Sequence, residues 1–333
     1  MSAARRADRR EGTLRVAVLK GGGSLERAVS LRSAARVQHT LRGLGHEVVA
    51  IDVGSDLVDR LMAAAPDAAF VALHGSDGED GTVQGLLETL ATPYTGSEPG
   101  ACQRCTDKAL AKYTMRAAGI PTPAFAAFKE SAVKDLGVAS VLPRLGSTIG
   151  LPLVVKPACQ GSALGIKFAA SPEELPAAIV GALSYDGKVV IERYVKGRDL
   201  AVSVLDSPRK LGAPASAPLA LPIVEAIPRE ESFYNYSSRY EIGMTTFVCP
   251  AELDEATTAR AQDLALEVYR LLGCHGMARV DLMLEEHTGE LTVLETNVVP
   301  GLTETSLLPQ AADAAGIDFE ELVARILESA FSR

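Results

Sequence analysis

The stretch LTVLETNVVPG, residues 291–301, alternates apolar with polar side chains before it breaks at a Pro-Gly pair. Alternate side chains of a strand share one face, so Val293, Glu295 and Asn297 are predicted to point the same way. The upstream stretch ARVDLMLEE, residues 278–286, has the same alternation, and EEHTGE between the two is typical of a hairpin turn. The sequence therefore predicts two antiparallel strands with polar groups on one face.

A hairpin centred near Thr288 places Asp281 opposite Glu295, and Arg279 opposite Asn297. Like charges directly opposed on a sheet destabilise it, and a cation between them would remove the repulsion. Mg²⁺ prefers carboxylate and carbonyl oxygens, usually together with phosphate. The hairpin thus indicates a magnesium–nucleotide site. The alternative is a solvated hairpin face with one unfavourable pair, and the hairpin alone does not decide between them.

Composition places the chain among globular proteins with two or three domains. Its 333 residues carry a net charge of −9, which argues against a broad nucleic-acid surface. No apolar run reaches about 18 residues, so no membrane-spanning helix is expected. Five scattered cysteines suit a reducing cytoplasm. Residues 1–12 are basic and polar, and we expect a disordered tail there.

The order of expected elements divides the chain into three parts. Residues 14–53 read as strand, Gly-rich loop, helix and strand, which predicts a parallel sheet. We expect an N-terminal α/β domain over 13–105 and a central α+β lobe over 106–191. A C-terminal lobe with the hairpin is expected over 192–333.

Two N-terminal motifs carry polar groups at loop positions. KGGGSLERAVSL (20–31) lacks the third glycine of a dinucleotide fingerprint, but its helix N-terminus suits an anion, and Glu26 is a candidate for a substrate ammonium. HGSDGEDGTVQG (74–85) follows a strand, where α/β sites lie. There Glu79 is a candidate for a cationic group. A surface glutamate at 26 and a structural His74 are the alternatives.

Two further motifs suggest phosphate binding and a lid. VVKPACQGSALG (154–165) places Lys156 at a strand end before a loop of small residues, an arrangement suited to phosphate although it is not a Walker A sequence. Lys108 is a second phosphate candidate, or a solvated helix lysine. FYNYSSRYEIG (233–243) holds three tyrosines and is either a lid or ordinary packing.

The order of these motifs resembles the D-alanine–D-alanine ligases of the ATP-grasp superfamily. HGSDGEDGTVQGLLE, DKALAK, GIPTP, PLVVKPACQGSALGI, FYNYSSRY, RVDLML and ETNVVPGLTETSLLP carry the resemblance, which covers about residues 14–330. It implies an ATP-grasp fold, α/β and α+β, with three lobes and an N-terminal parallel-sheet domain. It also implies a cytoplasmic homodimer that binds ATP and D-alanine, with no nucleic-acid or membrane partner.

The resemblance assigns roles to individual residues. Two Mg²⁺ (or Mn²⁺) on the ATP phosphates are expected at Asp281, Glu295 and Asn297. ATP itself is expected to contact Lys108, Lys156, Glu192, Asp199 and Arg239. A hydrogen-bonded trio that orders the first D-alanine and the closing loop is implied at Glu26, Ser162 and Tyr240. The tetrahedral intermediate is expected at Arg279 and the backbone of Gly301. Further substrate contacts are expected at His74, Glu79, Ser306 and Leu307.

Four positions depart from the family pattern. The phosphate loop reads Gly-Ser-Ala-Leu-Gly where Gly-Ser-Ser-Val-Gly is usual, which puts Ala163 in the loop. Gln160 and Arg239 stand where Glu and Lys are frequent, so a contact between them would lack an ion pair. Asp199 replaces a glutamate near the ribose and has a shorter reach. These changes affect the expected ATP affinity or loop closure.

The expected activity is ATP-dependent joining of two D-alanines through an acylphosphate, for peptidoglycan synthesis. One alternative is an ATP-grasp ligase for another amino acid or a specialised metabolite. A second alternative is a non-catalytic paralogue that only binds nucleotide. The presence of Asp281, Glu295, Asn297, Lys156 and Arg279 argues against the second alternative.

Overall fold

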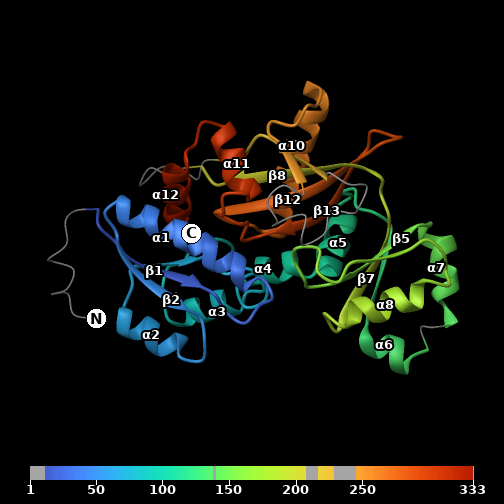
Figure 1. Ribbon diagram of the computed structural model, residues 1–333, viewed down its shortest axis with the longest axis horizontal. Coiled ribbons are helices and arrows are strands. Elements are labelled where there is room, and N and C mark those ends of the chain that lie inside the picture. Colours follow the sequence, from blue (N-terminus) through green and yellow to red (C-terminus); the bar gives the residue numbers. More distant parts are fainter. Residues whose placement is uncertain (1–11, 138–139, 208–216, 229–244, 333) are drawn as a thin grey trace.

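The computed structural model describes residues 12–137, 140–207, 217–228 and 245–332. Three sheets follow one another along the long axis of the molecule (Figure 1). The first sheet lies at one end, the third in the middle and the second at the other end. The expected basic tail, residues 1–12, lies outside the described residues except for Gly12. The expected domain boundaries at residues 105 and 191 stay a prediction.

The first sheet is parallel, as expected, with the order β2-β1-β3. Its strands are β1 (Arg15–Lys20), β2 (Glu47–Asp52) and β3 (Ala68–Val71). Its helices are α1 (Arg27–Gly43), α2 (Leu57–Ala64) and α3 (Thr82–Thr89). The central strand β1 is apolar and fully buried from Val16 to Leu19, because a parallel strand with both faces covered has no polar side.

The second sheet is antiparallel, with the order β4-β7-β5-β6. Its strands are β4 (Phe125–Lys129), β5 (Leu153–Pro157), β6 (Lys167–Ala169) and β7 (Lys188–Arg193). Its helices are α6 (Glu130–Asp135), α7 (Leu142–Ile149) and α8 (Leu175–Leu183). Alternate residues of β5 and β7 form a separate apolar core with α8, so this part has its own packing centre.

The third sheet has six strands and carries the predicted hairpin. Its strands are β8 (Gly197–Leu205), β9 (Leu219–Ala220), β10 (Val224–Pro228), β11 (Thr245–Val248), β12 (Met277–Glu285) and β13 (Leu291–Asn297). Its helices are α10 (Glu255–Leu272), α11 (Leu307–Ala314) and α12 (Phe319–Ser329). The last helix, α12, packs against α1, so the C-terminal end of the chain lies beside the first sheet (Figure 1).

Two consecutive helices connect the first sheet to the others. These are α4 (Pro99–Thr106) and α5 (Lys108–Ala117). Helix α5 contacts both α10 and β13, so it lies against the third sheet. The Asp107 carboxylate accepts the backbone N–H groups of Ala109 and Leu110 at 3.0 and 3.1 Å and caps α5. Lys188 on β7 donates to the same carboxylate at 2.7 Å, which joins the helix start to the second sheet.

The hairpin has the predicted register around its polar pair, but a β-bulge interrupts it. Asp281 pairs with Glu295 and Arg279 with Asn297, as the turn position predicts. The register shifts after Asp281, so that Leu282 pairs with Val293. The prediction that Val293 and Glu295 share a face is therefore wrong. Val293 packs in the core and Glu295 faces a cavity, because a bulge adds one residue and reverses the alternation.

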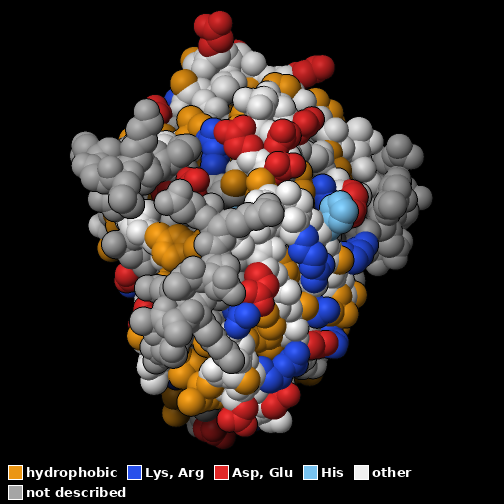
Figure 2. Space-filling model, turned by 90° about the vertical axis from the view of Figure 1, so that its left-hand side faces the viewer, with side chains coloured by type: hydrophobic (Ala, Val, Ile, Leu, Met, Phe, Trp, Pro, Cys, Tyr) orange, Lys and Arg blue, Asp and Glu red, His pale blue; other side chains and the backbone are white. Residues whose placement is uncertain are grey.

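The surface of the described part carries both signs of charge. On the face in Figure 2, Lys and Arg side chains lie across the centre and lower half, among Asp and Glu side chains. Within the described ranges, no helix is both long enough and apolar enough to cross a membrane.

The cap at Asp107 gives a test of how α5 is held. Asp107→Ala is expected to lower the free energy of unfolding by about 1–2 kcal/mol, since the cap contributes ~1 and the partly exposed pair with Lys188 at most ~1. Asp107→Asn keeps an acceptor and is expected to lose less than half of that. Urea unfolding measures both, with Asp318→Ala at the cap of α12 as a matched control. Equal losses for the two Asp107 variants would assign the effect to charge.

Candidate active site

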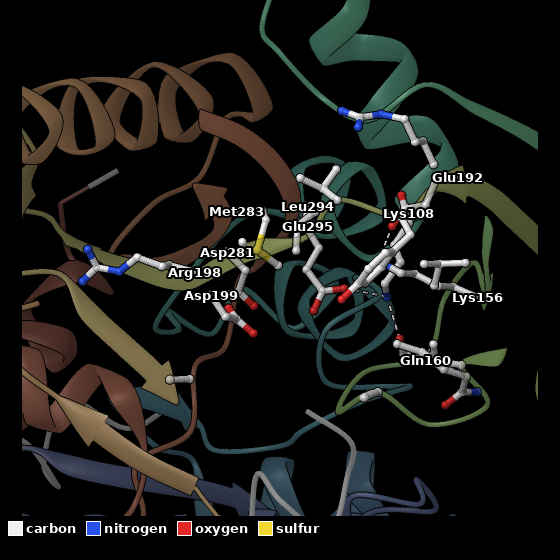
Figure 3. Close-up of a pocket in the computed structure, with 18 of the residues that line it drawn as sticks. Lys108, Lys156, Gln160, Glu192, Arg198, Asp199, Asp281, Met283, Leu294 and Glu295 are labelled. Carbon is white, nitrogen blue, oxygen red and sulfur yellow. Dashed lines mark hydrogen bonds and ion pairs between the residues drawn. The ribbon is translucent and has the colours of Figure 1, made fainter. Parts of the chain in front are cut away.

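A cavity of about 470 Å³ lies between the second and third sheets. Its walls come from β5 and β7 on one side and from β8, β10, β12 and β13 on the other, with Lys108 of α5 and the loop after β5. In Figure 3 the carboxylates of Asp199, Asp281 and Glu295 point into the same space. Lys108 and Lys156 approach that space from the opposite side. The cavity therefore has an acidic wall facing a basic one.

Each carboxylate of the predicted metal pair already has a cationic partner. The Arg279 guanidinium donates two hydrogen bonds to Asp281, at 2.6 and 2.8 Å. The Lys108 ammonium lies 3.2 Å from Glu295. Arg279 and Lys108 thus offset part of the repulsion between Asp281 and Glu295, so the repulsion alone does not require a metal ion. The oxygens still form a hard donor set that fits Mg²⁺.

The third predicted metal ligand, Asn297, lies opposite Arg279 on β13. Its side-chain oxygen accepts the backbone N–H of Val299 at 2.9 Å, which leaves that oxygen a second lone pair. Among the described residues, no three His, Cys, Asp or Glu side chains gather as a metal-binding group. The donor set at this place is therefore two carboxylates and one amide.

Two lysines hold the buried carboxylate of Glu192 on β7. Lys156 forms an ion pair with one oxygen, and Lys112 of α5 lies 2.8 Å from the other. Burial alone would raise the pKa of Glu192, but the two ammonium groups outweigh it, so that the pKa is lowered. Burial likewise opposes the charge of Lys156, yet Glu192 and Glu295 raise its pKa overall. Glu192 and Lys156 are therefore charged at neutral pH.

The loop after β5 joins the cavity to the first sheet. The Ser162 hydroxyl donates to the Glu26 carboxylate, and both side chains are buried. Ser162 and Ala163 both have positive φ, +52° and +57°, a conformation that residues with a side chain rarely adopt. A Cβ on Gly161 would lie 2.7 Å from a Glu26 oxygen, so a larger residue there would displace the Glu26 side chain. Two predicted members of the trio are thus in contact.

A second polar cluster surrounds His74 at the edge of the first sheet. Nδ1 of His74 lies 3.0 Å from the carbonyl oxygen of Val299, and Nε2 lies 3.1 Å from the Ser33 hydroxyl. A carbonyl only accepts, so Nδ1 carries the hydrogen and Nε2 of the neutral ring accepts from Ser33. Glu79 lies 3.6 Å from Nδ1. Burial raises the pKa of Glu79, the His74 ring opposes this, and Glu26 adds to the rise.

The loop after β13 is held by the first helix of the chain. The Ser33 hydroxyl accepts the backbone N–H of Leu302 at 3.1 Å, and Arg36 donates to the Leu302 carbonyl at 2.7 Å. Ser306 accepts the backbone N–H of Thr303 at 3.0 Å. These contacts fix the backbone that follows Gly301, where a Cβ would meet the Ser306 hydroxyl.

Family models match most of the chain. The model described as D-ala D-ala ligase C-terminus matches residues 114–328, and the model described as D-ala D-ala ligase N-terminus matches residues 58–97. The chain belongs to the D-alanine–D-alanine ligase family. A D-alanine–D-alanine ligase of Moorella thermoacetica is 42% identical over 95% of this chain and 99% of its own. One of Syntrophotalea carbinolica is also 42% identical, over 96% and 97%.

Solved structures of the same family agree with the fold. The crystal structure of D-alanine–D-alanine ligase from Bacillus anthracis is 34% identical, with a TM-score of 0.80 over 96% of this chain and 98% of its own. The structure of the Bacillus anthracis enzyme complexed with ATP is 32% identical, with a TM-score of 0.79 over the same shares. The expected family and the ATP-grasp fold are therefore confirmed.

The predicted ligase residues fall into two connected groups. The cavity is lined by Lys108, Lys156, Glu192, Asp199, Asp281 and Glu295. Around it, and in contact with the first sheet or the loop after β13, lie Glu26, His74, Glu79, Ser162, Gly301 and Ser306. Leu307 begins α11, and its side chain packs in the core. Tyr240 and Arg239 lie outside the described residues. The functional roles of all these residues remain predictions.

Two of the residues that depart from the family pattern, Gln160 and Ala163, lie at the cavity. The Gln160 amide points away from Lys108 and donates to the Tyr185 carbonyl at 3.0 Å (Figure 3). The Gln160 backbone carbonyl accepts from Lys108 at 2.6 Å. Ala163 lines the cavity and has a left-handed backbone conformation.

Several residues that line the ligase cavity were not predicted from the sequence. Met283 lies two residues after Asp281, and Val154 two residues before Lys156, so strand alternation already predicts both. Leu294 lines the cavity because of the bulge, which has no sequence signal here. Glu225 on β10 binds Arg198 on β8 at 2.7 Å through an ion pair that no motif indicates.

The thiol of Cys159 offers a pH test of the phosphate loop. Burial, with Asp186 and Asp107 nearby, raises the pKa of the Cys159 thiol to about 12. Its alkylation rate with iodoacetamide is expected to rise about tenfold per pH unit from pH 7 to 10 without levelling, since only the thiolate reacts. Peptide mass spectrometry measures the rate. Levelling near pH 9, as for a free cysteine of pKa about 8.5, would contradict the assignment, and Asp186→Asn is expected to accelerate the reaction.

Proposed function

We propose that this chain is a D-alanine–D-alanine ligase, which joins two D-alanines into a dipeptide at the expense of ATP. The observation that carries the proposal is the paired acids Asp281 and Glu295, each bound to a cation, in a cavity with Lys156 on the opposite wall. Membership of the family supports the reaction class. The product is a precursor of peptidoglycan.

In the first step, the γ-phosphoryl group of ATP moves to a carboxylate oxygen of the first D-alanine, and ADP leaves. We infer that Lys108 and Lys156 bind the phosphates, because both ammonium groups face the cavity. The loop from Gly161 to Gly165 supplies backbone N–H groups for the same phosphates. We assign Glu192 and Asp199 to the adenosine. Positioning and charge stabilisation supply most of the catalysis in phosphoryl transfer.

Magnesium fits the residues present at the acidic wall. Asp281, Glu295 and Asn297 supply hard oxygen atoms from adjacent strands, and we propose that they hold two Mg²⁺. When bound, Mg²⁺ would neutralise charge on the phosphate oxygens. Arg279 and Lys108 contact these two acids.

In the second step, the amine of the second D-alanine attacks the carbonyl carbon of the acylphosphate. Phosphate leaves as the peptide bond forms, and the amine loses a proton. We assign the developing oxyanion to Arg279 and the backbone N–H of Gly301, whose loop is fixed by Ser306 and the first helix. The contact between Glu26 and Ser162 closes the phosphate loop over the first D-alanine and excludes water.

The remaining alternatives are a ligase for another amino acid and a protein that only binds nucleotide. Phosphate release from ATP and Mg²⁺ with a panel of D- and L-amino acids separates them. Release with D-alanine, together with D-alanyl-D-alanine in the product mixture, is the expected result. Turnover confined to L-amino acids would reject the proposed substrate. ATP binding without any turnover would favour the non-catalytic reading. We also propose a homodimer, which light scattering during gel filtration tests.

The metal assignment predicts the behaviour of Glu295. Glu295→Gln is expected to lower kcat by more than about 100-fold, since even outer-shell partners of a metal change activity 10–100-fold. Stability in the absence of ligands is expected to change little, because the substitution removes one of two opposed charges together with its pairing to Lys108. Steady-state phosphate release and thermal unfolding provide the two measurements.

Glu286→Gln is the matched control, since Glu286 lies in the turn of the same hairpin and pairs only with exposed Lys196 among the described ion pairs. It is expected to keep wild-type turnover. Near-native turnover of Glu295→Gln would show that the acidic wall does not hold catalytic metal.

A further inference from the structure

Helix α5 carries a second lysine, Lys112, one turn after Lys108. Residues four apart on a helix share a face, so the two ammonium groups project the same way. Lys108 reaches Glu295 on β13 at 3.2 Å, and Lys112 reaches Glu192 on β7 at 2.8 Å. One helix therefore holds an acid from each of the two sheets that enclose the cavity.

Lys112 lies behind the cavity wall. Its side chain is fully buried, and it is absent from the described residues that line the cavity. The ammonium donates to the Thr122 hydroxyl at 2.8 Å, and that hydroxyl donates to the Val293 carbonyl at 2.9 Å. Val293 lies two residues before Glu295 on the same strand. Lys112 can therefore affect a nucleotide only through the groups that it holds.

Stability alone gives no reason for a lysine at this place. Lysine is almost never fully buried without a partner. Burial lowers the pKa of Lys112, although Glu192 opposes this, so the charged form carries a cost. Replacing a buried ion pair by apolar side chains is often neutral or stabilising. The charge of Lys112 therefore needs an explanation in the function of Glu192.

The two lysines around Glu192 differ in what else they can reach. Lys156 lines the cavity and faces the expected phosphates, while Lys112 does not. A phosphate that attracts Lys156 would leave Glu192 with a single cation. With Lys112 present, Glu192 keeps a buried cationic partner whether or not a phosphate attracts Lys156. Without Lys112, Glu192 and a phosphate would compete for Lys156.

We propose that Lys112 is a positioning residue for nucleotide binding: it fixes the Glu192 carboxylate from behind, so that Lys156 is available to a phosphate. This inference rests on the proposed function, because it assumes that the cavity binds ATP. It assigns Lys112 no contact with substrate.

The first test is Lys112→Met, which keeps an unbranched side chain of similar length. We expect its affinity for the non-hydrolysable ATP analogue AMP-PNP to fall by about tenfold or more, which corresponds to ~1.4 kcal/mol. The KM for ATP is expected to rise in parallel. The KM for D-alanine is expected to stay within about twofold, because the described contacts of Lys112 are to Glu192, Thr122 and Phe125 and to none of the expected D-alanine residues. Calorimetry and steady-state kinetics measure these quantities. Lys196→Met, at an exposed pair with Glu286, is the control and is expected to bind as the wild type does.

The second test asks whether Lys112 acts through Glu192. Glu192→Gln and the double variant Lys112→Met with Glu192→Gln complete a double-mutant cycle. If Lys112 acts through Glu192, the double variant binds AMP-PNP no more weakly than Glu192→Gln alone. Losses that add in the double variant would overturn the proposal.

Thr122→Val covers the case in which Lys112→Met fails to fold. It removes the hydroxyl that anchors Lys112 and keeps the charge, so AMP-PNP affinity is expected to fall by about threefold. Wild-type affinity in this variant, or an equal change in the KM values for ATP and D-alanine, would overturn the proposal. Failure of the proposed function can be distinguished from failure of this inference. In the former case, the wild type itself would turn over ATP without dependence on D-alanine.

Discussion

The rest of the site depends on the ion pairs between α5 and the two sheets that enclose the cavity, because these pairs give each buried acid a cationic partner. A charge in a protein interior costs several kcal/mol when it has no partner. Lys108 and Lys112 on one face of α5 supply cations to Glu295 on β13 and Glu192 on β7. A helix in any other place would leave both acids without these partners. The position of α5 is thus an electrostatic requirement of the site as well as a matter of packing.

The loop after β5 depends on the first sheet in the same way. Ser162 and Ala163 adopt a left-handed backbone, which costs of order 1–3 kcal/mol for each such residue. The contact of Ser162 with buried Glu26 and the close approach of Gly161 to the same carboxylate hold the loop in this shape. Glu26, at the start of the first helix, therefore determines the conformation of a cavity-lining loop. The two contacting residues are 136 positions apart in the sequence.

Predictions from the sequence were correct where local patterns alone determine the structure. Strand alternation and the position of the turn gave the pairing of Asp281 with Glu295. The order of strand, Gly-rich loop, helix and strand over residues 14–53 gave the parallel sheet. The face of Val293 was predicted wrongly, because a bulge depends on the surrounding sheet and leaves no mark in the chain. Lys112 was missed for a different reason: a single lysine in a helix resembles any solvated lysine until its burial is known. The cationic partners of the acid pair likewise required tertiary structure, since Lys108 and Glu295 lie far apart in the sequence.

The contacts of Leu302 and Val299 have a consequence for the order in which the protein is made. Arg36, Ser33 and His74 emerge from the ribosome early, yet their partners in the loop after β13 follow 266, 269 and 225 residues later. At a synthesis rate of about 5–20 residues per second, this delay is roughly 10–50 s. During that time the first sheet can form from local contacts, while the polar groups at its edge remain hydrated. The Gly301 loop thus acquires its shape as one of the last events of biosynthesis. A chain released before residue 302 lacks this part of the site together with α11 and α12, which complete the main apolar core.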